Sequence, residues 1–312
     1  MYYIGIDVGG TNVKAGLITE NGEIMKRAVR PTLAKRESDA IAADMIALVK
    51  EVAEGIDAAN IHSVGIGIPG ACDDKTGMVV NTANINFHMY PLGEKIQAAT
   101  GFSVYLGNDA NCAALGEYYA LPEKVQDMIF ITLGTGVGGG LILNGKLYTG
   151  FNGIAGEVGH IMLKDGGEKC GCGRRGCWEA YASVSALIRQ TRDYALAHPD
   201  SALRAACGEN MEAVSGKTAF VLARKGDADG KAVVDTWISY VAGGIVDMVN
   251  IFQPALLLIG GAISKEGEML LNPIRSFVAQ NSYSPDVAKT KIDVAALGND
   301  AGLIGAAFLG RK

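Results

Sequence analysis

Two glycine-rich turns, each between short apolar runs, constrain the fold of this chain more than any other feature. The first turn, residues 7–11, lies between residues 3–6 and 13–19. The second, residues 134–140, contains five glycines and lies between residues 128–133 and 141–143. Apolar runs separated by glycine turns are typical of β-hairpins. Because the two turns occupy equivalent places in their hairpins, we predict two related α/β halves.

The rest of the chain fits this prediction. Apolar spacing predicts helices over residues 38–52, 90–100, 110–120, 183–197, 231–250 and 302–309, and buried strands over residues 62–68, 103–106 and 255–259. Strands that alternate with helices indicate an α/β fold. A chain of 312 residues is longer than most single domains. Pro122 breaks a predicted helix, so we expect a domain boundary near residue 120.

The turns have the composition of phosphate-binding loops. Gly9 and Gly10 allow backbone N–H groups to approach an anion, Thr11 adds a hydroxyl donor, and Asp7 is suited to hold Mg²⁺. Either turn alone is also explained as an ordinary hairpin turn or a glycine-rich bulge. Two such loops together favour a nucleotide whose phosphates are held from two sides.

Asp109 follows a predicted strand and opens a predicted helix, in Gly107-Asn108-Asp109-Ala110-Asn111. Asn and Asp are favoured helix N-cap residues, which is one explanation of the motif. The other is that the Asp109 carboxylate accepts a proton from an attacking hydroxyl. The spacing does not separate the two.

Four potential metal ligands lie within 18 residues: His160, Cys170, Cys172 and Cys177. Three thiolates and one imidazole make a closed tetrahedral zinc site, which is structural rather than catalytic. A redox pair of cysteines would not explain His160 or Cys177. The zinc would also anchor a wall of polar side chains suited to a sugar's hydroxyls, formed by Glu157, His160 and Glu179.

Composition and charge exclude several classes of protein. The net charge is −5 and the basic residues are scattered, which argues against nucleic-acid binding. The N-terminus has no basic region, and the longest apolar run, residues 255–263, is shorter than the ~20 residues of a membrane span. We therefore expect a cytoplasmic protein with no membrane partner and with reduced thiols. The isolated cysteines, Cys72, Cys112 and Cys207, are expected to act as small apolar residues.

These motifs, in this order, resemble the ROK family of bacterial repressors, open reading frames and sugar kinases. The resemblance covers nearly the whole chain. It rests on residues 7–14, 107–111, 134–139, 156–160, 250–254 with Gly260-Gly261, and above all Cys170-Gly-Cys-Gly-Arg-Arg-Gly-Cys-Trp-Glu179. Trp178 departs from the family, in which an aliphatic residue is commoner, and we expect only altered packing there.

The resemblance implies an actin/hexokinase/Hsp70-like fold with a cleft between two domains. The smaller domain would be residues 1–120, completed by a helix at about 300–312, and the larger would be residues 121–299 with the zinc site. Asp109 would be the general base. Sugar hydroxyls would be bound by Gly70, Asn84, Asn108, Asp109, Glu157, His160 and Glu179. ATP and Mg²⁺ would be held by Asp7, Gly9, Gly10, Thr11, Lys14, Gly134, Thr135, Gly136, Gly138, Gly260 and Gly261.

The resulting expectation is an ATP-dependent sugar kinase that forms a homodimer or homotetramer. Glucose is the first choice of acceptor, with N-acetylglucosamine, N-acetylmannosamine, mannose, fructose and allose as alternatives. A sugar-sensing repressor of the same family would carry a helix-turn-helix domain ahead of the first hairpin, which here begins at residue 4. A non-catalytic sugar-binding protein remains a further alternative.

Overall fold

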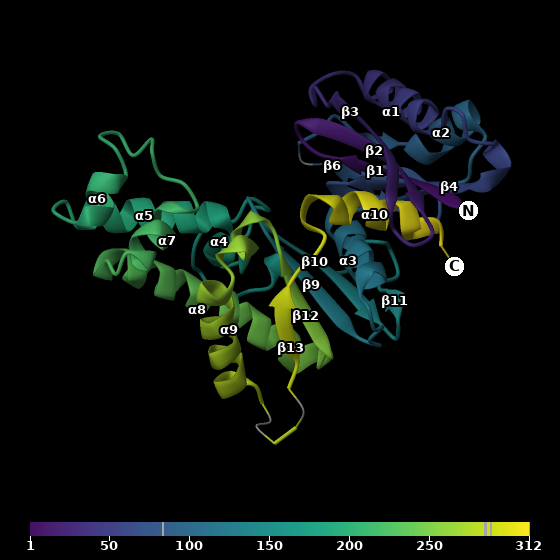
Figure 1. Ribbon diagram of the computed structural model, residues 1–312. Coiled ribbons are helices and arrows are strands. Elements are labelled where there is room, and N and C mark those ends of the chain that lie inside the picture. Colours follow the sequence, from purple (N-terminus) through teal and green to yellow (C-terminus); the bar gives the residue numbers. More distant parts are fainter. Residues whose placement is uncertain (83, 284–285, 288, 312) are drawn as a thin grey trace. The chain divides into compact units, whose positions relative to one another are not determined.

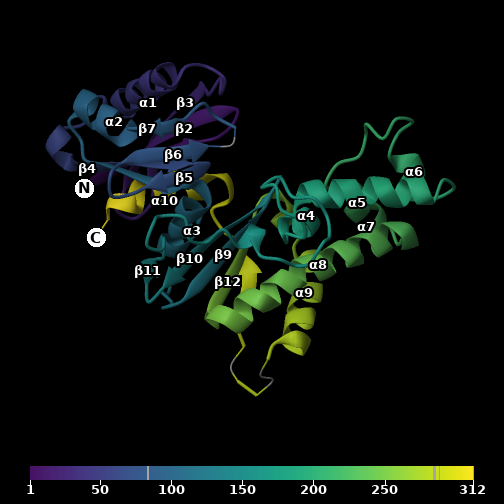
Figure 2. The ribbon, with the colours of Figure 1, turned by 180° about the vertical axis from the view of Figure 1, so that it is seen from behind.

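The computed structural model describes residues 1–82, 84–283, 286–287 and 289–311. The described chain divides into two compact units (Figures 1 and 2). Unit 1 comprises residues 1–130, 140–156 and 296–312, and unit 2 comprises residues 131–139 and 157–295. The predicted domain limits at residues 120 and 299 stay a prediction, and each unit is described here by itself.

The first sheet lies in unit 1 and has the strand order β3-β2-β1-β4-β8. Its strands are β1 (Tyr2–Val8), β2 (Asn12–Thr19), β3 (Ile24–Pro31), β4 (Ile61–Ile68) and β8 (Val104–Asn108). β1 pairs antiparallel with β2, and β4 pairs parallel with both β1 and β8. The predicted first hairpin is confirmed, and its glycine turn follows the carboxyl end of the central strand.

The second sheet repeats this order as β11-β10-β9-β12-β13. Its strands are β9 (Met128–Leu133), β10 (Val137–Leu143), β11 (Lys146–Leu147), β12 (Leu256–Gly260) and β13 (Lys291–Val294). The hairpin comes first in each set of strands, and two later strands extend the sheet beside its first strand. The prediction of two related halves is confirmed, and the architecture is that of the actin/hexokinase/Hsp70-like fold.

Helices cover both faces of the first sheet. In Figures 1 and 2, α1 (Ser38–Ala53) and α2 (Leu92–Thr100) lie on one face, and α3 (Asp109–Ala120) and α10 (Ala301–Ala307) lie on the other. Only glycine lets α10 lie so close to the strands. A Cβ on Gly5 would be 2.1 Å from the carbonyl oxygen of Leu303, and one on Gly65 would be 1.7 Å from that of Ala306. Part of the glycine content therefore serves packing.

A buried carboxylate holds the segment that leads into α10. Both oxygens of Glu117, on α3, accept backbone N–H bonds of 2.8 Å, one from Ala296 and one from Leu297. Burial raises the pKa of Glu117, and the two N–H groups partly oppose this rise. The predicted closing helix is confirmed, and it continues as a 3₁₀ turn over Phe308–Gly310.

Unit 2 contains six α-helices among its described residues. They are α4 (Glu179–Ala182), α5 (Val184–Ala197), α6 (Ala202–Ala206), α7 (Thr218–Arg224), α8 (Ala228–Phe252) and α9 (Glu268–Asn281). Trp237 on α8 and Phe220 on α7 are fully buried and meet edge to face. α8 is long and apolar enough to cross a membrane by length and composition, but 61% of its most apolar window is buried within the structure. This burial is typical of a core helix.

Several elements carried no clear sequence signal. They include a small sheet of β5 (Gly70–Asp73), β6 (Met78–Thr82) and β7 (His88–Tyr90), together with β3, β13 and α9. The helix predicted over residues 90–100 begins only at Leu92, because Pro91 disfavours a helical conformation at Tyr90. It ends as predicted, with Gly101 in the left-handed region at φ 79°. Short 3₁₀ turns occupy Ala58–Asn60, Val158–His160, Ala262–Glu266 and Gly298–Asp300.

Candidate functional site

The first glycine loop is braced by a residue that sequence reasoning missed. Thr32 is fully buried just beyond β3. Its hydroxyl donates to the carbonyl oxygen of Gly9 at 2.6 Å, and its backbone N–H donates to that of Thr11 at 2.8 Å. Gly9 closes the turn itself, donating from its N–H to Asn12 at 2.9 Å. A single threonine after a strand is too common a pattern to have identified this role.

Asp7 and Lys14 face each other at the base of this loop. They are partners in the β1–β2 register, and the Lys14 Nζ lies 3.2 Å from Asp7 Oδ2. Both side chains are partly exposed, at 21% for Asp7 and 37% for Lys14. The structure therefore places a carboxylate and an ammonium next to the turn formed by Gly9, Gly10 and Thr11.

The second glycine loop, in unit 2, is braced by a carboxylate. Glu179 Oε2 accepts the backbone N–H of Val137 at 3.0 Å. A Cβ on Gly136 would be 2.4 Å from the same oxygen, so any larger residue there would displace the Glu179 carboxylate. Thr135 and Gly138 lie in the same turn and the strand that follows it. Glu179, predicted as a sugar ligand, also holds the loop.

Gly261 brings the end of β12 against this loop. It has φ 90°, and a Cβ there would be 2.1 Å from the carbonyl oxygen of Leu133, the residue before Gly134. Gly260 is the last residue of β12. The predicted nucleotide residues of unit 2 are thus brought together at one end of β9 and β12.

Packing does not explain why residues 10 and 134 are glycines. A Cβ built on either residue would meet nothing within 4 Å, and neither backbone lies in the left-handed region. Glycine at these positions is consistent with close approach of a ligand to the backbone, which a side chain would obstruct.

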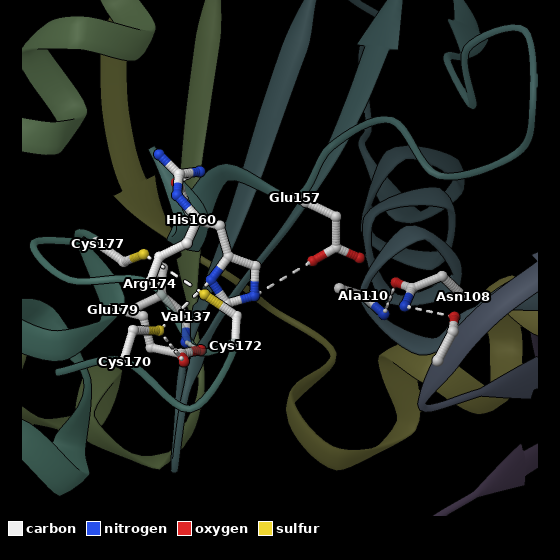
Figure 3. Close-up of polar contacts among 11 residues, drawn as sticks. Asn108, Ala110, Val137, Glu157, His160, Cys170, Cys172, Arg174, Cys177 and Glu179 are labelled. Carbon is white, nitrogen blue, oxygen red and sulfur yellow. Dashed lines mark hydrogen bonds and ion pairs between the residues drawn. The ribbon is translucent and has the colours of Figure 1, made fainter. Parts of the chain in front are cut away.

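Asn108 occupies the N-cap position of helix α3. The Asn108 side-chain oxygen accepts the N–H groups of Ala110 at 2.9 Å and Asn111 at 3.2 Å, and its amide nitrogen donates to Gly70 at 3.2 Å (Figure 3). Asp109 is the first residue of the helix and is partly exposed. Asp109 Oδ1 shares the N–H of Ala110 at 2.9 Å, while Asn108 alone also accepts the N–H of Asn111.

The Asp109 carboxylate acts electrostatically on two buried thiols, those of Cys72 and Cys112. Burial raises the pKa of the Cys72 thiol to about 12 and also raises that of the Cys112 thiol, and the charge of Asp109 adds to both shifts. These thiols and Cys207 are buried, as expected for small apolar residues. Gly70 packs closely on β6, since a Cβ there would be 2.2 Å from the carbonyl oxygen of Asn81. Asn84 lies exposed in the turn beyond β6.

The four predicted metal ligands converge in unit 2 (Figure 3). Their ligand atoms all lie within 4.8 Å of one another. His160 Nδ1 is 3.7 Å from the Cys170 sulfur, and the Cys172 and Cys177 sulfurs are also 3.7 Å apart. A tetrahedron with zinc–sulfur bonds of about 2.3 Å has edges of about 3.8 Å. The cluster of His160, Cys170, Cys172 and Cys177 fits a structural zinc site.

The imidazole of His160 faces two ways. Its Nδ1 points at the sulfurs, while its Nε2 lies 4.0 Å from Glu157 Oε2 (Figure 3). Cys170 Sγ lies 3.6 Å from Glu179 Oε1 on the other side. Glu157 and Glu179 therefore lie on either side of the metal cluster, and His160 is one of its ligands.

Arg174, whose role sequence reasoning missed, and Trp178, for which only altered packing was expected, support this cluster. The Arg174 guanidinium donates to the carbonyl oxygen of His160 at 3.3 Å. Trp178 is fully buried, donates its indole N–H to Tyr240 at 2.8 Å, and lies over Gly244, where a Cβ would be 2.1 Å from the ring. The tryptophan thus packs the metal-binding segment onto α8.

Comparison with known proteins identifies the family. The sequence matches the ROK family over residues 3–312. It is 36% identical to the glucokinase of Halalkalibacterium halodurans over 99% of this chain and 94% of that protein. It is 33% identical to the N-acetylmannosamine kinase of Salmonella typhi over 99% and 98%.

A solved structure agrees over the whole length. The ROK family glucokinase of Streptomyces griseus, in complex with glucose and AMPPNP, matches with a TM-score of 0.82 at 36% identity, covering 100% of this chain and 99% of that one. The chain therefore belongs to the ROK family and is one of its ATP-dependent sugar kinases.

Proposed function

We propose that this kinase phosphorylates glucose to glucose 6-phosphate, with Asp109 as the general base. The observation that carries the assignment of the base is the division of labour at the start of α3. Asn108 is the N-cap, accepts two backbone N–H groups and binds the Gly70 carbonyl, whereas Asp109 shares only the N–H of Ala110. Glucose as acceptor is supported by the relatives named glucokinase at 36% identity.

In the proposed reaction, Asp109 orients the sugar hydroxyl and accepts its proton as the oxygen attacks the γ-phosphorus of ATP. The bond from that phosphorus to the bridging oxygen breaks, and ADP leaves. Phosphoryl transfer requires mainly positioning and charge stabilisation. General-base assistance of this kind contributes about 10²–10⁴-fold to the rate.

The glycine loops hold the phosphates in this proposal. Backbone N–H groups around Gly10 and Gly134 face the phosphate oxygens, and the absence of side chains there permits close approach. Asp7, Thr11 and Lys14 contribute in unit 1, and Thr135, Gly136, Gly138, Gly260 and Gly261 in unit 2. When bound near Asp7, Mg²⁺ would neutralise charge on the phosphates.

The sugar hydroxyls are bound by Asn84, Asn108, Glu157, His160 and Glu179, with the Gly70 backbone. His160 offers Nε2 to the sugar because Nδ1 faces the sulfurs. The Asn108 amide already makes three hydrogen bonds, which leaves one N–H for a hydroxyl. The structural zinc keeps His160 and the carboxylates beside it in fixed positions.

An N-acetylhexosamine is the second candidate acceptor, favoured by the N-acetylmannosamine kinase at 33% identity. The two candidate acceptors differ at carbon 2 of the sugar, where glucose carries a hydroxyl and an N-acetylhexosamine carries an acetamido group. A site that hydrogen-bonds the hydroxyl rejects an analogue lacking it by as much as about 10⁴-fold. A cytoplasmic homodimer or homotetramer remains part of this proposal.

The test is ADP release from Mg-ATP with glucose, mannose, fructose, allose, N-acetylglucosamine and N-acetylmannosamine. We expect the highest kcat/KM with glucose, and ³¹P NMR of the product should show a phosphate on the 6-hydroxyl. A higher kcat/KM with an N-acetylhexosamine would replace glucose as the acceptor.

The matched control is Asp109→Asn with each sugar. ADP release that the wild type shows and Asp109→Asn lacks depends on the proposed site. If the protein releases no ADP from Mg-ATP with any of the six sugars, while calorimetry still shows glucose binding, the result would favour a sugar-sensing protein.

A further inference from the structure

One short segment of unit 1 connects the first glycine loop with the turn that carries Asn84. This bridging segment comprises residues 32–38, from the end of β3 to the first residue of α1. At its start, Thr32 binds the loop at residues 9–11 through its hydroxyl and its backbone N–H. Further along, the segment binds the turn at residues 84–87, which lies beyond β6. It therefore contacts two of the regions to which the proposed reaction assigns ligands.

Three hydrogen bonds join Asn86, in this turn, to alternate residues of the bridging segment. Its backbone N–H donates to the carbonyl oxygen of Ala34 at 3.0 Å, and its side-chain amide donates to that of Arg36 at 3.1 Å. The Ser38 hydroxyl donates in turn to the carbonyl oxygen of Asn86. Because each hydrogen bond depends on distance and direction, the three together fix both the place and the orientation of the turn.

The bridging segment is itself anchored at both ends. The Arg36 guanidinium donates to the Thr32 carbonyl oxygen at 3.1 Å and pairs with the Asp44 carboxylate on α1. Thr32 is fully buried and is bound to the glycine loop. Asn86 therefore docks onto a segment that is tied to a helix on one side and to the glycine loop on the other.

The residues that follow Asn84 determine where its side chain lies. Asn84 is exposed, so the protein does not enclose it, whereas Ile85 and Phe87 are buried in the core of unit 1. The hydroxyl of the buried Thr82, on β6, donates to the carbonyl oxygen of Ile85. The core thus holds the turn on one side, and the bonds of Asn86 hold it on the other.

We propose that Asn86 is a positioning residue for the sugar acceptor, which holds the turn so that Asn84 reaches a sugar hydroxyl. This inference rests on the proposed function, in which Asn84 is one of the sugar ligands. Asn86 acts through Asn84, because its backbone N–H, side-chain amide and carbonyl are all engaged with the bridging segment. Loss of these bonds should weaken sugar binding and leave the nucleotide loop as it is, since Thr32 keeps its own bonds.

Calorimetric titration of the full chain with glucose, and separately with AMPPNP, tests this inference without turnover. Asn86→Ala should weaken glucose binding about fivefold, as expected for the loss of one hydrogen bond, and leave AMPPNP binding unchanged. Ser38→Ala removes a bond from the other partner and should act in the same direction, and α1 loses no cap because its N-cap is Glu37. Asn281→Ala, which removes a similar exposed bond to Phe277 in unit 2, is the matched control and should keep both affinities.

A double-mutant cycle separates positioning from a general structural role. If Asn86 acts through Asn84, then Asn84→Ala and the double variant Asn84→Ala/Asn86→Ala should bind glucose equally weakly. Additive losses, an equal loss of AMPPNP affinity, or unchanged glucose affinity in both Asn86→Ala and Ser38→Ala would overturn the inference.

The same titrations distinguish this inference from the proposed function. Unchanged glucose affinity in Asn84→Ala would remove Asn84 from the proposed sugar site, and the role of Asn86 with it. If another sugar of the panel has a higher kcat/KM than glucose, the acceptor in the proposed function changes, and the cycle is measured with that sugar.

Discussion

The two glycine loops occupy the same place in two sheets of the same strand order, yet they are held by different chemistry. The loop at residues 9–11 is held by Thr32, which directly follows β3, an edge strand of the same sheet. The loop at residues 134–139 is held by Glu179, which follows directly after the metal-binding segment. The first loop is braced by a residue that directly follows β3, and the second by the first residue of α4, which directly follows the metal-binding segment.

The two halves therefore share a strand order but not the side chains that hold their glycine loops. Residues 148–178 contain little regular structure, so they need another source of order. A closed metal site supplies folding energy directly. Perturbing the zinc ligands should therefore affect unit 2 and leave unit 1 intact, and the predictions below run from the largest expected effect to the smallest.

Cys172→Ser should have the largest effect, because it removes one of four zinc ligands. We expect the zinc content to fall from one atom per chain to near zero, with several kcal/mol of stability lost and sugar phosphorylation abolished. Elemental analysis, thermal unfolding and hydrogen exchange measure these quantities. Cys207→Ser is the control, since Cys207 is buried elsewhere in unit 2. This variant protein should keep its zinc at the four-residue metal site. Well-folded wild-type protein without zinc would contradict the assignment.

Asp109→Asn tests unit 1 alone. We expect kcat to fall by at least about 10²-fold, because the amide cannot accept the proton, while glucose affinity and zinc content stay unchanged. Asp235→Asn, an exposed acid on α8, should keep the wild-type rate. A near-normal kcat in Asp109→Asn would remove this residue from its role.

Gly10→Ala and Gly134→Ala compare the two loops directly. Each added methyl group meets open space in the protein, so stability should not change. If the phosphates approach both loops, the KM for ATP should rise about tenfold in each variant. This rise corresponds to a loss of about 1.4 kcal/mol in the free energy of binding. Gly171→Ala, with the same open surroundings in the metal-binding turn, should leave this KM unchanged. A rise in only one variant would show that one loop alone holds the nucleotide.

Thr32→Val should have the smallest effect and sharpen the comparison most. It removes the hydroxyl bond to Gly9 at a cost of about 1 kcal/mol and leaves Glu179 untouched. The KM for ATP should rise a few-fold, while the KM for glucose and the zinc content stay constant. A change in zinc content would mean that the supports of the two loops are coupled.

Local sequence patterns determined much of this protein. The two hairpins, the helices α1, α3, α5, α8 and α10, and the metal ligands could all be predicted, because apolar periodicity and ligand spacing are properties of short segments. The family resemblance added the predicted sugar and nucleotide residues, which stay predictions. The small sheet of β5–β7, β13 and α9 could not be predicted, since their short or mixed patterns acquire meaning only against neighbours in the fold.

Only the tertiary structure decided which residue does what within each motif. Asn108 and Asp109 are equally good caps by composition and share the N–H of Ala110, but only Asn108 also accepts the N–H of Asn111 and binds Gly70. Glu179 and Thr32 became loop supports through residues 42 and 23 positions away in the chain. A hydrogen bond depends on distance and direction in space, and sequence spacing does not determine either one over such separations.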